Sequence, residues 1–143
     1  MAIEKVGVVG CGVMGSGIVQ VAAISGFEVT FVARSPEKVE RDWGLIERSL
    51  AKAVEKNKVS RQEADGARAR IRGTSDLAEL GACDLIIETI TEDLERKKEL
   101  LAELDRIVPP NVILTTNTSS FSVSEIAAAT RRLQRVAGLH FFN

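Results

Sequence analysis

Short apolar runs alternate with longer amphipathic stretches along the whole chain. Residues 6–9 are apolar and mostly β-branched, which predicts a buried strand. An apolar run of helix length follows at 14–25 and stops before Gly26, a residue typical of helix ends. The remaining predicted strands cover residues 28–33, 71–74, 84–90, 112–116 and 136–142.

The stretches between these strands carry helical signals. Pro36 is well placed for a first turn, and apolar residues then recur every three or four positions, which predicts one buried stripe (Val39, Trp43, Ile46, Leu50, Ala53). We expect the charged residues of this helix, Asp42 among them, to form a solvated face. A second helix is expected over 92–107, before two prolines, and serine–glutamate capping boxes at 60–63 and 122–125 open two short ones.

The order of strands and helices predicts one domain over residues 1–143. Alternation of this kind is typical of a parallel sheet covered on both faces, so we expect an α/β, Rossmann-type doubly wound sheet of six or seven strands. Ligands of such sheets bind across the carboxyl ends of the strands. The polar segments at 10–15, 33–35, 90–92, 117–120 and 140–143 all fall at that edge.

The first strand leads directly into the sequence Gly10-Cys11-Gly12-Val13-Met14-Gly15, which has the spacing G-x-G-x-x-G. Between a strand and a helix, this pattern is a dinucleotide-binding fingerprint. The first glycine makes the tight turn, the second admits a pyrophosphate, and the third lets helix and strand pack closely. Free N–H groups at the helix start then bind the phosphates. The alternative is an ordinary glycine-rich turn.

Composition narrows the remaining possibilities. A net charge of −1 gives no electrostatic reason to expect nucleic acid or an anionic membrane as a partner. Cys11 and Cys83 have no zinc or disulfide spacing, and the single histidine excludes a multi-histidine metal site. The chain runs straight into its first strand and has no apolar stretch of membrane-spanning length, so we expect a cytoplasmic protein.

Three segments together resemble a known family. The glycine turn, the Asn117-Thr118-Ser119-Ser120 turn and the final 138–143 segment, Gly-Leu-His-Phe-Phe-Asn, are similar to the NAD-binding domain of 3-hydroxyacyl-CoA dehydrogenases. The bacterial 3-hydroxybutyryl-CoA dehydrogenases are the closest group within that family. The resemblance implies reversible oxidation of a 3-hydroxyacyl-CoA, which we expect to be short-chain, to the 3-oxoacyl-CoA, with an acyl-CoA as substrate partner.

The resemblance also implies roles for individual residues. His140 corresponds to the general base that takes the 3-hydroxyl proton, and its ordinary pKa near 6.5 suits that role. Ser119 and Asn143 correspond to polar partners of the substrate oxygen and the nicotinamide. The remaining roles divide between cofactor (Gly10, Gly12, Val13, Met14, Gly15, Glu92, Lys97, Asn117) and CoA (Ser49, Lys56). The structural alternatives are turn formation for the Asn and Ser residues, a favourable helix-dipole contact for Glu92 and a solvated side chain for Lys97.

The chain departs from the usual NAD pattern at the end of its second strand. Rossmann domains that bind NAD carry an acidic residue there, which binds the adenosine ribose. This chain has Ala33 instead, followed by Arg34 and Ser35. A guanidinium and a hydroxyl favour a 2′-phosphate, so we expect NADP(H) to be preferred to NAD(H). The alternative is that Arg34 points to solvent and cofactor choice is loose.

The second departure is that the sequence stops after Asn143. In the family, a glutamate on the following strand pairs with the histidine, and a helical C-terminal domain closes the cleft and forms the homodimer. We therefore expect these 143 residues to bind the dinucleotide but to turn over acyl-CoA poorly. Two other interpretations remain: a stand-alone dinucleotide-binding or redox-sensing module, and a dehydrogenase of another small 3-hydroxy acid. Sequence beyond residue 143 would separate the first of these from the enzyme.

Overall fold

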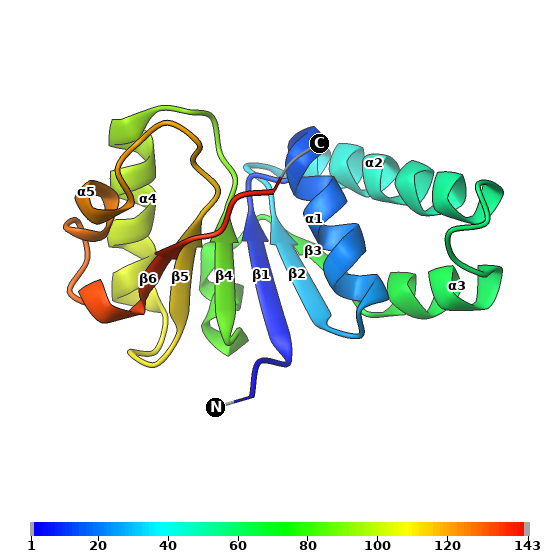
Figure 1. The fold of residues 1–143 in the computed structure, drawn as a ribbon, viewed down its shortest axis with the longest axis horizontal. Helices are drawn as coiled ribbons and strands as arrows, with labels where there is room; N and C mark the ends of the chain where they lie inside the picture. The colour runs from blue at the N-terminus through cyan, green and yellow to red at the C-terminus, as the bar shows by residue number, and fades with distance from the viewer. Residues whose placement is uncertain (1, 142–143) are drawn as a thin grey trace.

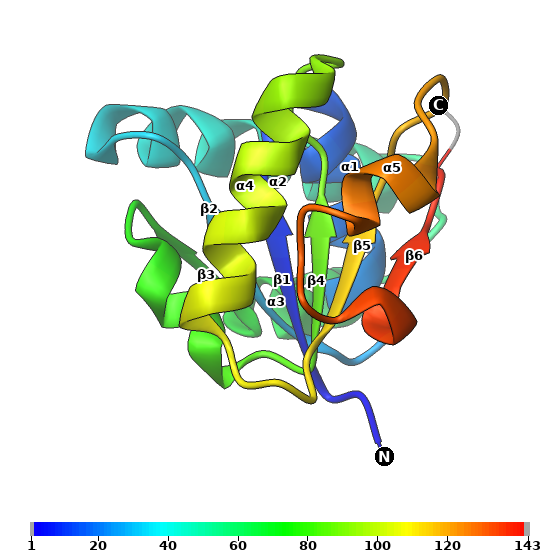
Figure 2. The same cartoon turned by 90° about the vertical axis from the view of Figure 1, so that its left-hand side faces the viewer.

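In the computed structural model, which describes residues 2–141, six parallel strands form one sheet covered by helices (Figures 1 and 2). The strand order is β3-β2-β1-β4-β5-β6, and each of the five neighbouring pairs is parallel. This order reverses between β1 and β4, as expected of a doubly wound sheet. The predicted Rossmann-type fold is confirmed.

The elements follow the predicted order. The strands are β1 (Lys5–Val9), β2 (Glu28–Val32), β3 (Ile71–Thr74), β4 (Leu85–Glu88), β5 (Ile113–Thr116) and β6 (Val136–Gly138). The α-helices are α1 (Gly12–Ile24), α2 (Pro36–Glu55), α3 (Arg61–Ala69), α4 (Leu94–Ile107) and α5 (Val123–Ala127). Two 3₁₀ segments, η1 (Leu77–Ala82) and η2 (Leu133–Arg135), complete the described chain.

Several predicted boundaries were wrong by a few residues. Helix α4 begins at Leu94 instead of residue 92, because the side chain of Asp93 accepts a hydrogen bond from Arg96 N and caps the helix. Strand β6 ends at Gly138, before His140. At both predicted capping boxes, the serine hydroxyl accepts a bond from the backbone N–H three residues later. The box is complete at 60–63, but at 122–125 the Glu125 carboxylate contacts Lys98 instead of the backbone of Ser122.

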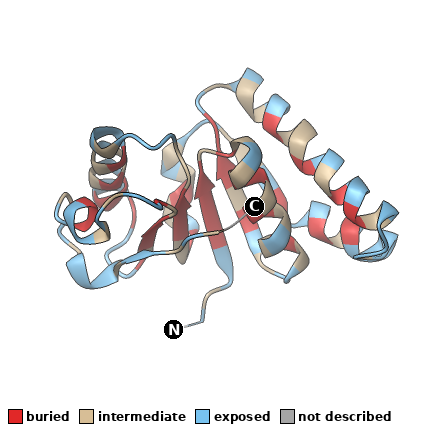
Figure 3. Cartoon of the chain, turned by 45° about the horizontal axis from the view of Figure 1, so that its top comes forward, coloured by how far each residue is buried: buried red, intermediate tan, exposed pale blue. Residues whose placement is uncertain are grey.

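The core lies in two layers, one on each face of the sheet (Figure 3). On one face, β1, β2 and β3 pack against α1, α2 and α3, with Phe31, Ile46 and Val19 fully buried. On the other face, Ile86 and Leu114 pack against Leu101 and Leu104 of α4. These layers fix the strand ends, and the loops at the carboxyl edge carry the candidate site. No helix in the described range is long and apolar enough to cross a bilayer.

Candidate active site

The glycine turn between β1 and α1 is shaped by two close approaches. Gly10 has φ +87°, and a Cβ there would lie 2.9 Å from the backbone N of Ile90. A Cβ on Gly15 would lie 2.5 Å from the Gly10 carbonyl oxygen, so any larger residue would push α1 away from β1. The Thr89 hydroxyl donates to the same carbonyl. The turn therefore needs glycine at both positions, as the motif predicts.

The N-terminus of α1 offers its N–H groups to a ligand. Its N-cap residue, Cys11, makes no side-chain capping bond, whereas side chains cap the other four α-helices. A Cβ built on Gly12 would meet no described atom within 4 Å. An uncapped helix start beside open space is suited to a phosphate, because the first-turn N–H groups and the helix dipole both favour an anion. The turn thus fits a dinucleotide pyrophosphate.

A cleft of about 770 Å³ opens beside this turn, between the end of β2 and α4. Its wall includes Ala33 at the position where an acidic residue is usual, and four cationic residues, Arg34, Lys38, Arg41 and Arg96. Ser35 is not among the lining residues: its hydroxyl accepts a bond from Lys38 N and caps α2. Of the two residues predicted to contact a 2′-phosphate, Arg34 lines the cleft, whereas Ser35 caps helix α2.

Asp42 is the clearest disagreement with the predicted solvated face of α2. The residue is 1% exposed, and it lines the same cleft as Ala33. Arg41, the adjacent residue, bonds one carboxylate oxygen at 3.2 and 3.3 Å. Asp42 comes three residues after Val39 and four before Ile46, so helical periodicity places it beside the apolar stripe, and it both is buried and lines the cleft.

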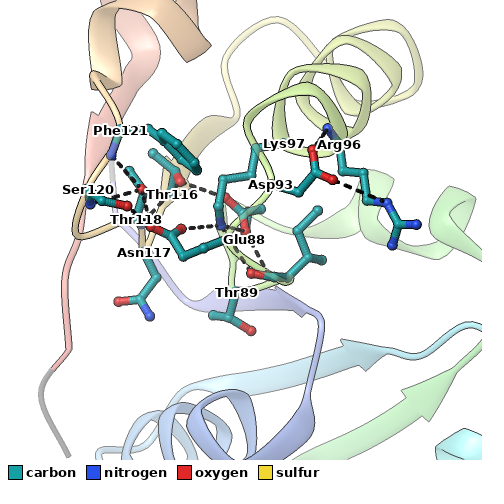
Figure 4. A network of polar contacts seen from close by, with 12 residues as sticks. Glu88, Thr89, Asp93, Arg96, Lys97, Thr116, Asn117, Thr118, Ser120 and Phe121 are labelled. Atoms are coloured by element: carbon teal, nitrogen blue, oxygen red, sulfur yellow. Dashed lines mark hydrogen bonds and ion pairs between the residues drawn. The ribbon is translucent and has the colours of Figure 1, made fainter.

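A buried ion pair between Glu88 of β4 and Lys97 of α4 is also bonded by β5, through Thr116 (Figure 4). Lys97 Nζ lies 2.6 Å from a Glu88 carboxylate oxygen, 3.1 Å from Glu92 and 3.1 Å from the Ile90 carbonyl. The Thr116 hydroxyl donates to the other Glu88 oxygen at 2.5 Å. Both charged side chains of the 2.6 Å pair are almost wholly buried, so the alternative of a solvated Lys97 is wrong.

Glu92 links this pair to the loop after β5. One of its oxygens contacts Lys97, and the other accepts hydrogen bonds from Thr118 at 2.9 Å and Ser120 at 2.5 Å. Burial raises the pKa of the Glu92 carboxyl, but the bonds from Ser120, Thr118 and Lys97 and the Lys97 charge outweigh it, and the pKa falls to about 2. The Glu92 side chain stays 41% exposed, within reach of a ligand at the edge.

Asn117 holds the last described segment against β5. Its side-chain oxygen accepts a bond from Phe141 N at 2.7 Å, and its backbone N–H donates to the Glu88 carbonyl oxygen at 2.9 Å. The Nδ1 atom of the exposed His140 lies 3.2 Å from the Asn117 carbonyl oxygen. A proton on Nδ1 would satisfy that contact, and in this tautomer Nε2 carries the lone pair that a base requires.

The other predicted site residues are placed less completely. Ser119 is exposed in the loop after β5, between Thr118 and Ser120, whose hydroxyls both donate to Glu92. The predicted role of Asn143 falls on a residue outside the described range. On α2, the Ser49 hydroxyl donates to the Gln20 side chain of α1, and Lys56 is exposed at the helix end.

Both cysteines are buried, and their thiols are held in the protonated form. Burial, with a smaller contribution from the Asp42 charge, raises the pKa of Cys11 to about 12. Burial and the Asp84 charge raise the pKa of Cys83 to about 11. Within the described residues, no group of three His, Cys, Asp or Glu side chains is arranged to hold a metal ion.

Comparison with known proteins identifies the family. Residues 5–143 match the family model described as "3-hydroxyacyl-CoA dehydrogenase, NAD binding domain". The chain is 46% identical over 143 residues to a 3-hydroxybutyryl-CoA dehydrogenase of Mycobacterium tuberculosis. It is 41% identical over 141 residues to a 3-hydroxyadipyl-CoA dehydrogenase of Escherichia coli K12. These matches cover 99% of this chain in both cases, but only 50% and 30% of the relatives.

Solved structures give the same result. The crystal structure of M. tuberculosis FadB2 superposes with a TM-score of 0.96 at 45% identity, over 100% of this chain and 50% of that one. An (S)-3-hydroxybutyryl-CoA dehydrogenase from Ralstonia eutropha gives 0.95 at 39% identity, over 99% and 50%. The chain thus spans about half the length of the M. tuberculosis and R. eutropha relatives. It belongs to the family of NAD-binding domains of 3-hydroxyacyl-CoA dehydrogenases.

Proposed function

We propose that this chain is the N-terminal domain of an oxidoreductase that interconverts a short-chain 3-hydroxyacyl-CoA and the 3-oxoacyl-CoA. The observation that carries the proposal is the pair of contacts from Asn117 to His140 and Phe141, which holds His140 at the same sheet edge as the glycine turn. A base beside a dinucleotide is what hydride transfer from an alcohol requires. A redox-sensing module has no need of such a base.

In the proposed reaction, His140 takes the proton of the substrate's 3-hydroxyl through Nε2. A nicotinamide bound at this edge would supply the hydride acceptor: C3 would lose one hydride, the 3-hydroxyl would lose the proton that His140 takes, and C3 would become a carbonyl carbon. Asn117 orients the imidazole through its carbonyl oxygen, and the imidazole keeps the proton until it passes to solvent or returns in reduction. Ser119 and Asn143 are proposed to contact the substrate oxygen and the nicotinamide.

Glu92 and Lys97 have different proposed tasks at the nicotinamide end. Glu92 keeps an exposed carboxylate that can accept bonds from a ribose hydroxyl. Lys97 already donates to three oxygens, so we assign it the positioning of Glu92. Ser49 and Lys56 are proposed for the CoA moiety. The rest of the protein is proposed to contain the helical domain that closes the cleft and forms a homodimer.

The proposed cofactor preference is NADP(H) over NAD(H). The cleft wall supports it, because Arg34, Lys38 and Arg41 line the cleft together with the end of β2, where Ala33 adds no negative charge. Titration of both cofactors tests the preference, and tighter binding of NAD(H) would overturn it. The Ala33→Asp variant restores the usual acid and is expected to weaken NADP(H) binding while NAD(H) binding is retained or improved.

The activity itself is tested with the full-length protein and 3-hydroxybutyryl-CoA, following formation of the reduced cofactor. Loss of a general base costs about 10²- to 10⁴-fold in rate, so His140→Gln should lose at least about a hundredfold in kcat. Cofactor affinity measured on the same variant shows whether the fold and the dinucleotide site are intact. A variant that keeps most of its kcat would remove His140 from the role of base.

A further inference from the structure

The wall of the cofactor cleft lacks a carboxylate on β2 but has one on α2. Ala33, where the strand-end acid of NAD-binding Rossmann domains would stand, is only 9% exposed and carries no polar group. Asp42 comes from the second turn of α2 and lines the same cleft. The Asp42 carboxylate is also close enough to Cys11, in the glycine turn, to raise the pKa of that thiol.

Burial of Asp42 has little compensation inside the protein. The side chain is 2% exposed, and its two hydrogen bonds both come from the 61% exposed Arg41 and both reach Oδ1. A buried carboxylate normally collects several donors, because the loss of hydration is costly. Asp42 therefore keeps acceptor capacity that the fold does not use.

The free acceptor is Oδ2, on a residue that lines the cleft. Within residues 2–141, no donor bonds Oδ2, yet no buried side-chain oxygen in that range lacks a hydrogen-bond partner. Oδ2 must therefore contact solvent, although the residue as a whole is 1% exposed. The opening that Asp42 lines is the cofactor cleft.

We infer that Asp42 replaces the missing strand-end acid: its Oδ2 accepts a hydrogen bond from the 3′-hydroxyl of the adenosine ribose. The inference rests on dinucleotide binding at this edge. A hydroxyl is the donor that the ribose offers, and a carboxylate oxygen already desolvated in part binds it more strongly than water-exposed groups do.

The 3′-hydroxyl is the ribose group that NAD(H) and NADP(H) share. Arg41 neutralises part of the Asp42 charge through Oδ1, and Arg34 and Lys38 add positive charge to the same wall. A 2′-phosphate is therefore not repelled from this wall as it would be from an unpaired strand-end acid. Asp42 anchors the ribose of either cofactor, and the cations decide between them.

A charge-matched pair of variants tests the inference. Asp42→Asn removes the carboxylate with little change of shape, whereas Glu103→Gln removes an exposed carboxylate from the same cleft. Loss of a hydrogen bond to a charged group is worth about tenfold in affinity, so Asp42→Asn should weaken NAD⁺ and NADP⁺ by similar factors of about ten, and Glu103→Gln by less than about twofold. Unchanged affinity, or a gain confined to NADP⁺, would overturn the inference.

A change on the ligand side keeps the test independent of how well the variant folds. AMP should bind the unaltered protein about tenfold more tightly than 3′-deoxy-AMP, and Asp42→Asn should bind the two alike. Equal binding of both nucleotides by the unaltered protein would refute the 3′-hydroxyl contact even if the dinucleotide site is real. Absence of any NAD⁺ or NADP⁺ binding would instead overturn the proposed function, and the inference with it.

Discussion

Replacing Glu88 by glutamine is the sharpest test of how the carboxyl edge is held together. Glu88 is 0% exposed and its carboxylate accepts three bonds, from Lys97 Nζ at 2.6 Å, Ile90 N at 2.7 Å and the Thr116 hydroxyl at 2.5 Å. Glutamine has one acceptor oxygen in place of two, so its amide N–H₂ faces either two donors, Lys97 Nζ and Ile90 N, or the Thr116 hydroxyl, which must turn to accept. Lys97, at 1% exposure, then loses its nearest counter-charge.

The expected cost follows from the burial of both partners. Removing one member of a buried ion pair costs about 3–5 kcal/mol of unfolding free energy, since the other charge stays desolvated. The remaining contacts of Lys97, to Glu92 and the Ile90 carbonyl at 3.1 Å, place the expected value at the lower end, about 3 kcal/mol. Replacing both members removes the unpaired charge, so Glu88→Gln/Lys97→Met should cost clearly less than the sum of the single variants.

Urea unfolding followed by circular dichroism measures these free energies. The matched control is Glu125→Gln, which breaks the exposed contact to Lys98 at 3.1 Å and should cost about 0.2–1 kcal/mol. Strict additivity of Glu88→Gln and Lys97→Met, or a Glu88→Gln cost no larger than that of the control, would refute the assignment of a coupled buried pair.

Two further predictions concern the turn and the loop beside it. A Cβ on Gly15 would lie 2.5 Å from the Gly10 carbonyl, whereas one on Gly17 meets nothing within 4 Å. Thermal unfolding should therefore show Gly15→Ala less stable by about 1–3 kcal/mol and Gly17→Ala more stable by about 0.5–1 kcal/mol. In cofactor titration, only Gly15→Ala should bind defectively. Similar behaviour of the two variants would contradict the packing. Because the Glu92 pKa falls from 4.5 to about 2 on folding, its contribution to stability is present above pH 4.5 and is lost as the pH falls towards 2. Stability measured over that interval should fall less steeply in Glu92→Gln, and parallel profiles would show that Glu92 is not hydrogen-bonded in solution.

The fold followed from the sequence because local signals and sheet topology agreed. Short apolar runs separated by helix-length segments leave few arrangements other than a parallel, doubly wound sheet. The glycine positions were predicted from the motif, and the structure supplies their physical reason in the contacts of Gly10 and Gly15. Strand and helix ends were less predictable, because the Asp93 cap competes with residue 92 for the helix start.

The electrostatics of the site were harder to predict. A glutamate at the end of an apolar strand was a signal for Glu88, but its pairing with Lys97 depends on how α4 packs against β4 and β5. Asp42 resembled any charged residue of an amphipathic helix, and only the tertiary structure shows that it reaches the cofactor cleft. The link between Asn117 and His140 likewise joins segments 23 positions apart, which no local pattern encodes.

The location of the dinucleotide is the central claim, and amide chemical shifts of the ¹⁵N-labelled protein test it most directly. On titration with NAD⁺ and NADP⁺, the largest changes are expected at the carboxyl edge of the sheet, in Gly10–Gly15, Arg34, Thr89–Glu92, Asn117–Ser120 and His140. The 370 Å³ pocket at the opposite edge, lined by Lys5, Glu28, Arg70 and Cys83, serves as the internal control and should not respond. Changes centred on that pocket, or none at the glycine turn, would contradict the account.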